Sequence, residues 1–181
     1  IKELTSAWQT ANNENIPFES IESLNYSLYS QLVRLKDALV HDGYMDFSYA
    51  IRLATEELNK ISDKRGTDIE KFNYLFVDEY QDISRQRYNL IKEISSLCNA
   101  KIVAVGDDWQ SIYAFSGSVL SLFTRFCQEF GYGQELKITR TYRNAQELID
   151  IAGTFVQRNA EQIRKSLISN KSIDNPVVIQ T

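Results

Sequence analysis

The sequence has few of the residues that build metal sites and disulfide frameworks, with two cysteines, one histidine and two prolines among 181 residues. Cys98 and Cys127 have no metal-ligand spacing and are too few for a disulfide framework. They predict reduced thiols in a reducing, cytoplasmic compartment and no structural metal. No apolar run approaches membrane-spanning length, so we expect no membrane association. No segment resembles a signal peptide, although one could precede Ile1.

Glycine is also scarce. None of the seven glycines begins the pattern G-x-x-x-x-G-K-[ST]. That pattern forms the loop that cradles the phosphates of a nucleotide, and its Ser or Thr completes a Mg²⁺ site. The 181 residues therefore contain no phosphate-binding loop of this kind.

An excess of positive charge is missing as well, because the net charge is −4. Residues 1–70 carry 7 basic and 12 acidic side chains, residues 71–136 carry 6 and 8, and residues 137–181 carry 7 and 4. A protein that binds single strands in a narrow channel needs local rather than global positive charge. The mild acidity therefore counts only weakly against DNA binding.

The first part of the chain has a helical spacing of apolar residues. Leucines and isoleucines three and four apart predict one amphipathic helix over residues 18–40. A second stripe, from Phe47 to Ile61, predicts another helix that ends at the turn residues 63–66. We expect both stripes to face a core.

After residue 70 the pattern alternates between strands and helices. Strands are predicted at 72–77, 101–105 and 136–138, and helices at 84–97, 118–129 and 144–155. Ser84 is the expected N-cap of the first of these helices, and Asn144 with Glu147 resembles a capping box. Such alternation is typical of βαβ units around a parallel sheet, so the predicted class is α/β.

The first candidate for chemistry is the apolar run Leu75–Val77, which reads as a buried strand and ends on Asp78 and Glu79. This is the Walker B arrangement, in which the Asp holds Mg²⁺ and the Glu activates the water that attacks the γ-phosphate. The alternative is an apolar strand that ends in two solvated acids.

A second apolar run, Lys101–Val105, ends on Gly106, Asp107 and Asp108, with the amide of Gln110 close behind. Neighbouring parallel strands that deliver polar groups at their carboxyl ends form the nucleotide sites of open α/β sheets. We therefore expect the two strands to be adjacent and parallel, with Asp78 and Gln110 at the same edge.

These blocks resemble a known family. Asp78-Glu79-Tyr80-Gln81-Asp82 resembles the D-E-x-Q-D box of the UvrD/Rep-like superfamily 1 DNA helicases, and residues 106–113 resemble their motif G-D-x-x-Q-S-I-Y. Thr141-Tyr142-Arg143-Asn144 is similar to their N-Y-R-S motif. The Asp-Asp-Trp-Gln form of residues 107–110 resembles the helicase IV-like branch. Residues 44–47 match a further upstream segment less well, because Tyr49 replaces an expected Asp.

The resemblance implies a partial RecA-like P-loop NTPase sheet with flanking helices and a helical N-terminal segment. Residues 1–70 would end an inserted helical subdomain and return to the first motor domain. Residues 71–134 would be the C-terminal half of that RecA-like domain, and residues 135–181 the start of the second. The chain is then expected to be an internal fragment of a larger helicase.

The family also implies residue roles in binding and hydrolysing ATP with Mg²⁺. Asp78 would hold the metal through water and Glu79 would be the general base. Gln110 would sense the γ-phosphate, with Asp107 beside it at the nucleotide. Arg143 would be an arginine finger and Tyr142 would stack on the adenine.

Further motif residues imply DNA contact and supporting roles. Tyr113 and Phe115 would stack on the bases of a single strand, for which the alternative is packing in the core. Ala114 and Ser116 stand where many relatives have arginines, and the role of Trp109 stays open. Gln81 and Asp82 are expected to orient neighbouring motifs.

The predicted function is that of a fragment of an ATP-dependent DNA helicase. It would couple ATP hydrolysis to 3′–5′ translocation on single-stranded DNA and to unwinding at duplex junctions. The alternative is a catalytically inactive helicase-like module that binds or regulates a partner. The fragment alone is expected to be inactive, because the parts of the chain that complete the ATP site are missing.

Overall fold

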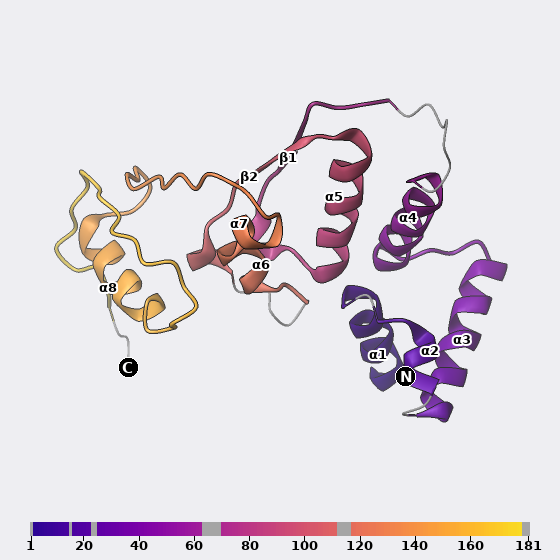
Figure 1. Ribbon diagram of the computed structural model, residues 1–181. Helices are drawn as coiled ribbons and strands as arrows, with labels where there is room; N and C mark the ends of the chain where they lie inside the picture. The colour runs from indigo at the N-terminus through magenta and orange to yellow at the C-terminus, as the bar shows by residue number, and fades with distance from the viewer. Residues whose placement is uncertain (1, 15, 23–24, 63–69, 112–116, 179–181) are drawn as a thin grey trace.

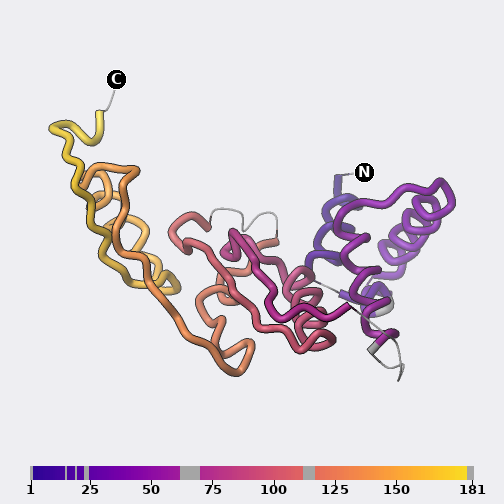
Figure 2. Tube along the Cα trace, turned by 90° about the horizontal axis from the view of Figure 1, so that it is seen from above, coloured from indigo at the N-terminus to yellow at the C-terminus, as the bar shows by residue number. Residues whose placement is uncertain are grey.

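The computed structural model describes residues 2–14, 16–22, 25–62, 70–111 and 117–178. Its elements lie in three groups along an elongated molecule, and the two termini belong to different end groups (Figures 1 and 2). The first group is all helical and comprises α1 (Lys2–Asn13), α2 (Phe18–Glu22), α3 (Tyr26–His41) and α4 (Phe47–Ser62).

The middle group contains the strands. It comprises β1 (Tyr74–Val77), the 3₁₀ turn η1 (Tyr80–Asp82), α5 (Arg85–Cys98), β2 (Lys101–Ala104), the 3₁₀ turn η2 (Asp108–Gln110), α6 (Leu120–Thr124) and α7 (Phe126–Glu129). The third group contains α8 (Gln146–Val156) and the irregular chain that follows it. The mixture of helices with a parallel strand pair confirms the α/β class at this level.

The N-terminal helices enclose a core of their own. Trp8 of α1 lies at its centre, with its ring centroid 5.5 Å from that of Phe18 and 5.8 Å from that of Tyr49. The Trp8 indole donates a hydrogen bond to Asp46, which also accepts from the Tyr49 amide at 2.6 Å and so caps the start of α4. The aromatic cluster therefore sets how α1, α2 and α4 meet.

Two expectations about this region are wrong. The predicted helix 18–40 is two helices, because Asn25 leaves the helical conformation (φ −154°) and its side chain accepts a hydrogen bond from the Leu28 amide at 3.0 Å. An N-cap of this kind starts a new helix. In α4 the stripe begins with Phe47, yet Phe47 is 90% exposed, and the residue that enters the core is Tyr49.

The strand pair agrees with the prediction. β1 and β2 are adjacent and parallel, with Tyr74 opposite Lys101 and Val77 opposite Ala104. The ladder continues past the strands, since the Val105 amide donates to the Val77 carbonyl and the Tyr80 amide to the Val105 carbonyl, both at 2.9 Å. The loops after the two strands therefore begin side by side at one edge.

The helix between the strands is also as expected at its start. The Ser84 side chain caps α5 by accepting from the Arg87 amide at 3.3 Å. The helix ends at Asn99, whose φ of +53° places it in the left-handed region that closes many helices. Helix α5 also packs against α4, which joins the helical group to the sheet.

The prediction that the first strand is buried is wrong. Side chains of β1 alternate, and Phe76 is 73% exposed while Leu75 and Val77 are partly covered. Tyr74 is exposed as well, so the described helices leave uncovered the face of β1 that carries Tyr74 and Phe76. Tyr80, Ile83, Tyr88 and Leu122 form the buried core instead.

The remaining differences lie towards the C-terminus. The predicted helix 118–129 is broken into α6 and α7 at Arg125, whose φ of −113° is not helical. Residues 136–138 form no strand, because no described strand lies beside them to share hydrogen bonds. Helix α8 has Ala145 at its N-cap, and the Glu147 carboxylate accepts from Ser172 and the Ile173 amide rather than closing a capping box with Asn144.

Across the described ranges, no helix combines the length and apolar character needed to cross a membrane.

Candidate active site

The loop after β1 presents two exposed carboxylates, Asp78 and Glu79. Asp78 accepts a hydrogen bond from the Glu79 amide at 2.9 Å. Glu79 has φ +51°, a left-handed conformation that costs a residue with a side chain roughly 1–2 kcal/mol. Besides Glu79, the only described non-glycine residue with positive φ is Asn99, which ends a helix. Glu79 instead precedes the turn η1 and ends no helix, and backbone strain of this kind is common at functional sites.

Gln81 joins this loop to the next one. Its buried side chain donates to Glu79 Oε2 at 2.6 Å and accepts from the Asp107 amide at 3.0 Å. Gly106 permits this contact, because a Cβ at that position would lie 2.5 Å from Gln81 Oε1. The Ser111 hydroxyl also donates to the Gln81 carbonyl at 3.3 Å. Gln81 therefore connects the two loops, and these contacts agree with the expectation that it binds a neighbouring motif.

The loop after β2 is organised around Asp107. One of its carboxylate oxygens accepts from Gln110 Nε2 at 2.8 Å, and the other accepts from the Trp109 amide at 3.2 Å. The ammonium of Lys165 donates to the same carboxylate. Gln110, which is exposed, is thus held by a carboxylate that also binds a distant lysine.

The pKa of Asp107 reflects these contacts. Burial alone would raise it, but the hydrogen bonds from Lys165 and Gln110, the charge of Lys165 and the Trp109 amide together hold the pKa below the ordinary aspartate value. Asp107 is therefore a charged acceptor with its donors in place.

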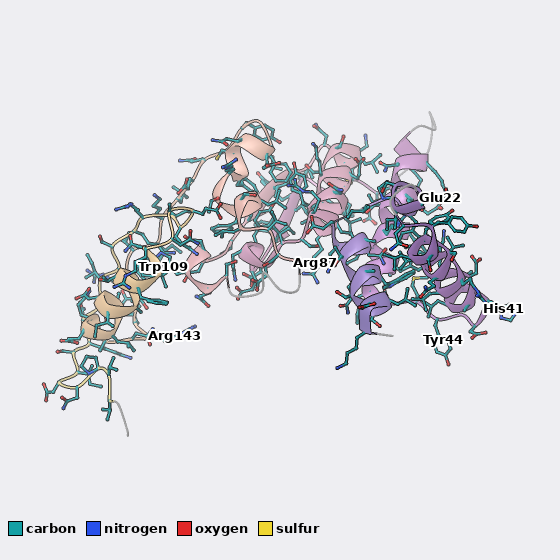
Figure 3. All side chains as sticks on the ribbon, turned by 90° about the horizontal axis from the view of Figure 1, so that it is seen from below. Glu22, His41, Tyr44, Arg87, Trp109 and Arg143 are labelled. Carbon is teal, nitrogen blue, oxygen red and sulfur yellow. The ribbon has the colours of Figure 1, made fainter. Side chains whose placement is uncertain are left out.

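Asp108 and Trp109 complete a contact with the C-terminal segment, by which we mean residues 140–178. Asp108 is 1% exposed and accepts from the Ile163 amide at 2.6 Å and from Lys165 at 2.8 Å. The Trp109 indole donates to the Ile163 carbonyl at 3.3 Å, and Figure 3 shows Trp109 projecting beside α8. The role of Lys165 was not predicted from the sequence, because a single lysine in a polar stretch matches no motif.

Tyr142 and Arg143 lie elsewhere on the C-terminal segment and are exposed. Figure 3 shows Arg143 apart from Trp109. The Arg143 amide donates to Thr141 Oγ1 at 3.3 Å and its carbonyl accepts from Lys171 at 3.5 Å. Among the described residues, neither side chain forms a hydrogen bond with Asp78, Glu79 or Gln110. The structure thus brings together the two strand-end loops and leaves the motif at 141–144 apart from them.

Tyr113 and Phe115, the predicted DNA-binding residues, lie outside the described residues.

The donor set after β1 fits Mg²⁺ in kind. Mg²⁺ prefers carboxylate and water oxygens, and in nucleotide sites it takes one or two carboxylates together with the phosphates. The exposed carboxylate of Asp78 is such a donor. The described part of the chain contains no group of three or more His, Cys, Asp or Glu side chains able to hold a metal by themselves. Any Mg²⁺ here would therefore need ligands from a nucleotide and water.

Comparison with known proteins gives consistent matches. The family model for the UvrD/REP helicase N-terminal domain matches residues 1–131. DNA helicase IV of Escherichia coli is 38% identical over 144 residues, which cover 79% of this chain and 20% of that protein. The ATP-dependent DNA helicase Rep of Buchnera aphidicola is 32% identical over 161 residues, covering 88% of this chain and 22% of the relative.

DNA helicase II of Rickettsia typhi is 24% identical over 170 residues, covering 94% of this chain and 25% of the relative. The chain spans a fifth to a quarter of the length of these three relatives. The family was predicted from the motifs at 78–82, 106–113 and 141–144, and the family model matches well over half of the chain. The chain belongs to the UvrD/REP helicase family.

Proposed function

We propose that the protein acts as part of an ATP-dependent DNA helicase that couples ATP hydrolysis to 3′–5′ movement on single-stranded DNA and to duplex unwinding. The family assignment and the names of the relatives, which include an ATP-dependent DNA helicase, support this proposal. In this proposal residues 71–134 are half of a RecA-like domain, residues 135–181 begin a second, and residues 1–70 are the helical segment before them.

The observation that carries the proposal is the joining of the two strand-end loops. Gln81 binds Glu79 on one side and the Asp107 amide on the other, so Glu79 and the loop that bears Gln110 keep a fixed relation. Hydrolysis of a γ-phosphate needs a base and a phosphate-binding group held together in advance. The strained backbone of Glu79 is a cost that such preorganisation explains.

The roles in hydrolysis follow from the chemistry of each group. Asp78 would hold Mg²⁺, which when bound neutralises charge on the phosphates. Glu79 would accept the proton of the attacking water, and Gln81 would orient its carboxylate. Gln110 would donate its amide to the γ-phosphate, and Asp107 would act at the nucleotide by fixing the direction of that amide.

The remaining roles concern the C-terminal segment and the residues proposed to bind DNA. Arg143 would supply positive charge to the transferred phosphoryl group and Tyr142 would stack on adenine once the C-terminal segment closes on the nucleotide. Both side chains are exposed and available for this. Tyr113 and Phe115 would stack on the bases of single-stranded DNA.

The test is the substitution Glu79→Gln in the full-length protein. It keeps the shape of the side chain but removes the proton acceptor, so DNA-stimulated ATP hydrolysis should fall by at least roughly 10²-fold while nucleotide binding persists. Glu22→Gln is the matched control, because Glu22 is an exposed residue of α2. The Glu22→Gln variant should hydrolyse ATP at the normal rate.

Hydrolysis that survives Glu79→Gln would overturn the assigned base. An unmodified protein that binds DNA or a partner without hydrolysing ATP would instead favour the inactive module. We expect the 181 residues alone to show no hydrolysis, because no phosphate-binding loop occurs among them.

A further inference from the structure

Three consecutive residues after β2 are attached to a part of the chain more than forty residues away. Asp107 and Asp108 both bind Lys165, and Trp109 packs on α8. None of these contacts belongs to the proposed chemistry of Asp78 and Glu79. The loop that holds Gln110 is thus attached to the C-terminal segment by contacts separate from that chemistry.

The attachment is built from buried groups. Asp108 is almost fully buried, and a buried carboxylate is tolerated only when it is paired and hydrogen-bonded. Its two partners, the Ile163 amide at 2.6 Å and the Lys165 ammonium at 2.8 Å, both come from the C-terminal segment. The Lys165 side chain is itself only 13% exposed. The contact is therefore a buried junction rather than a surface ion pair.

Trp109 packs against both α8 and Lys165 at the junction, by which we mean the contact of residues 107–109 with the C-terminal segment. Its ring lies so close to Gly153 of α8 that a Cβ there would come within 2.8 Å of Cη2. Lys165 Nζ lies 4.9 Å from the centre of the same ring, within the range of a cation–π contact. Lys165 therefore touches Asp107, Asp108 and Trp109 at once.

The path from Lys165 to the nucleotide site has two steps. Lys165 binds one oxygen of Asp107, and the other oxygen accepts from Gln110 Nε2 at 2.8 Å. Gln110 is exposed, so water competes for its amide unless Asp107 is held in place. Removing Lys165 would leave Asp107 held by the Trp109 amide and by Gln110 alone, so the direction of Gln110 would be less well fixed.

We propose that Lys165 is a positioning residue that acts through Asp107 on Gln110, so that the response of the nucleotide site depends on where the C-terminal segment lies. This inference rests on the proposed function. Asp107 is bound by Lys165 on one side and by Gln110 on the other, so the positions of these two side chains depend on each other. Coupling between sites typically amounts to roughly 5–150-fold in binding affinity.

The experiment measures DNA-stimulated ATP hydrolysis and thermal unfolding of the full-length protein with Lys165→Met, Lys165→Arg and the control Lys71→Met. Lys71 is exposed and makes no ion pair within the described residues. Lys165→Met should lower kcat roughly tenfold with little change in the KM for ATP, because the sensor rather than the binding of ATP is affected. Lys165→Arg keeps the charge and should recover part of kcat, and Lys71→Met should match the unmodified protein.

A double-mutant cycle with Gln110→Ala separates positioning from mere stability. If Lys165 acts through Gln110, Lys165→Met should cost little more once Gln110 is gone. Additive losses, or a lower unfolding temperature with an unchanged kcat, would overturn the inference. If Lys165→Met does not fold, Asp107→Asn tests the same path, since it weakens the link to both partners with Lys165 present.

The outcome also separates this inference from the proposed function. If the unmodified protein is active and the losses of kcat in Lys165→Met and Gln110→Ala are additive, only the role of Lys165 is refuted. An unmodified protein without DNA-stimulated hydrolysis would refute the proposed function, and this role of Lys165 with it.

Discussion

The loops after β1 and β2 each carry two consecutive acids at the same edge of the sheet, but the acids are used in opposite ways. Asp78 and Glu79 are exposed, and in the described part of the chain no lysine or arginine forms an ion pair with them. Asp107 and Asp108 share Lys165, and Asp108 is buried. Similar sequence patterns at neighbouring strand ends have thus produced two different pairs of acids. We call Asp78 and Glu79 the open pair and Asp107 and Asp108 the closed pair.

The difference shows what each pair can do. A carboxylate that is already bound by an ammonium and by amides has little capacity left for a metal or a proton. An exposed carboxylate on a strained backbone has that capacity, at a cost in stability. The open pair suits chemistry, and the closed pair suits the connection between two parts of the chain.

The largest expected effect concerns Arg143, the proposed arginine finger for the phosphoryl group that the open pair would act on. If the C-terminal segment closes on the nucleotide, Arg143→Ala in the full-length protein should reduce DNA-stimulated turnover by roughly 10³–10⁵-fold. The measurement is kcat at saturating ATP. Arg158→Ala, at another exposed arginine of the same segment, is the control. Near-normal turnover of Arg143→Ala would remove this residue from the site.

A smaller effect is expected at the junction of the closed pair with α8. Gly153→Ala would place a methyl group 2.8 Å from Trp109 Cη2, and overpacking of this kind costs about 1–3 kcal/mol. Chemical denaturation of the 181-residue chain measures the loss. The same substitution in a Trp109→Phe background should cost less, because the smaller ring leaves room. Equal losses in both backgrounds would show that the strain lies elsewhere.

The smallest expected effect is a pH dependence of the closed pair. The pKa of Asp107 is lower in the folded chain than in the unfolded one. Its stabilisation is therefore fully present above the unfolded value of about 3.9 and is lost as the pH falls through the lower folded value.

Unfolding free energies of the unmodified chain and of Asp107→Asn should therefore differ at pH 7 and converge at pH values well below 4. In a Lys165→Met background the difference at pH 7 should be smaller, because Lys165 is among the causes of the lowered pKa. A difference that persists unchanged into acid would contradict the role of the Asp107 charge.

Parts of the fold that depend on neighbouring residues could be predicted from the sequence. The β1–α5–β2 unit follows from two apolar runs and a crossover helix, and the Ser84 cap from one hydroxyl before that helix. The resemblance of residues 78–82 to the family motif led us to expect that Gln81 contacts a neighbouring motif, and it does. The break at Asn25 was missed because the apolar spacing continues across it, although an asparagine before a helical stripe is itself a cap signal.

Features that depend on distant residues could not be predicted. Whether residues 136–138 pair depends on a neighbouring strand, and whether β1 is buried depends on what covers its faces. Asp78 and Asp108 look alike in sequence, and only the approach of Lys165, 57 residues after Asp108, makes one open and the other closed. The residues of the candidate site could therefore be named from the sequence, but their attachment to the C-terminal segment could not be predicted.

The most direct test of this contrast applies the same change, Asp to Asn, to one member of each pair in the full-length protein. Thermal unfolding and DNA-stimulated ATP hydrolysis are measured for Asp78→Asn and Asp108→Asn. Asp78→Asn should abolish hydrolysis and leave the unfolding temperature unchanged. Asp108→Asn should lower the stability by about 1–3 kcal/mol, because Lys165 loses a buried charged acceptor. Loss of stability in Asp78→Asn together with retained hydrolysis would contradict the account.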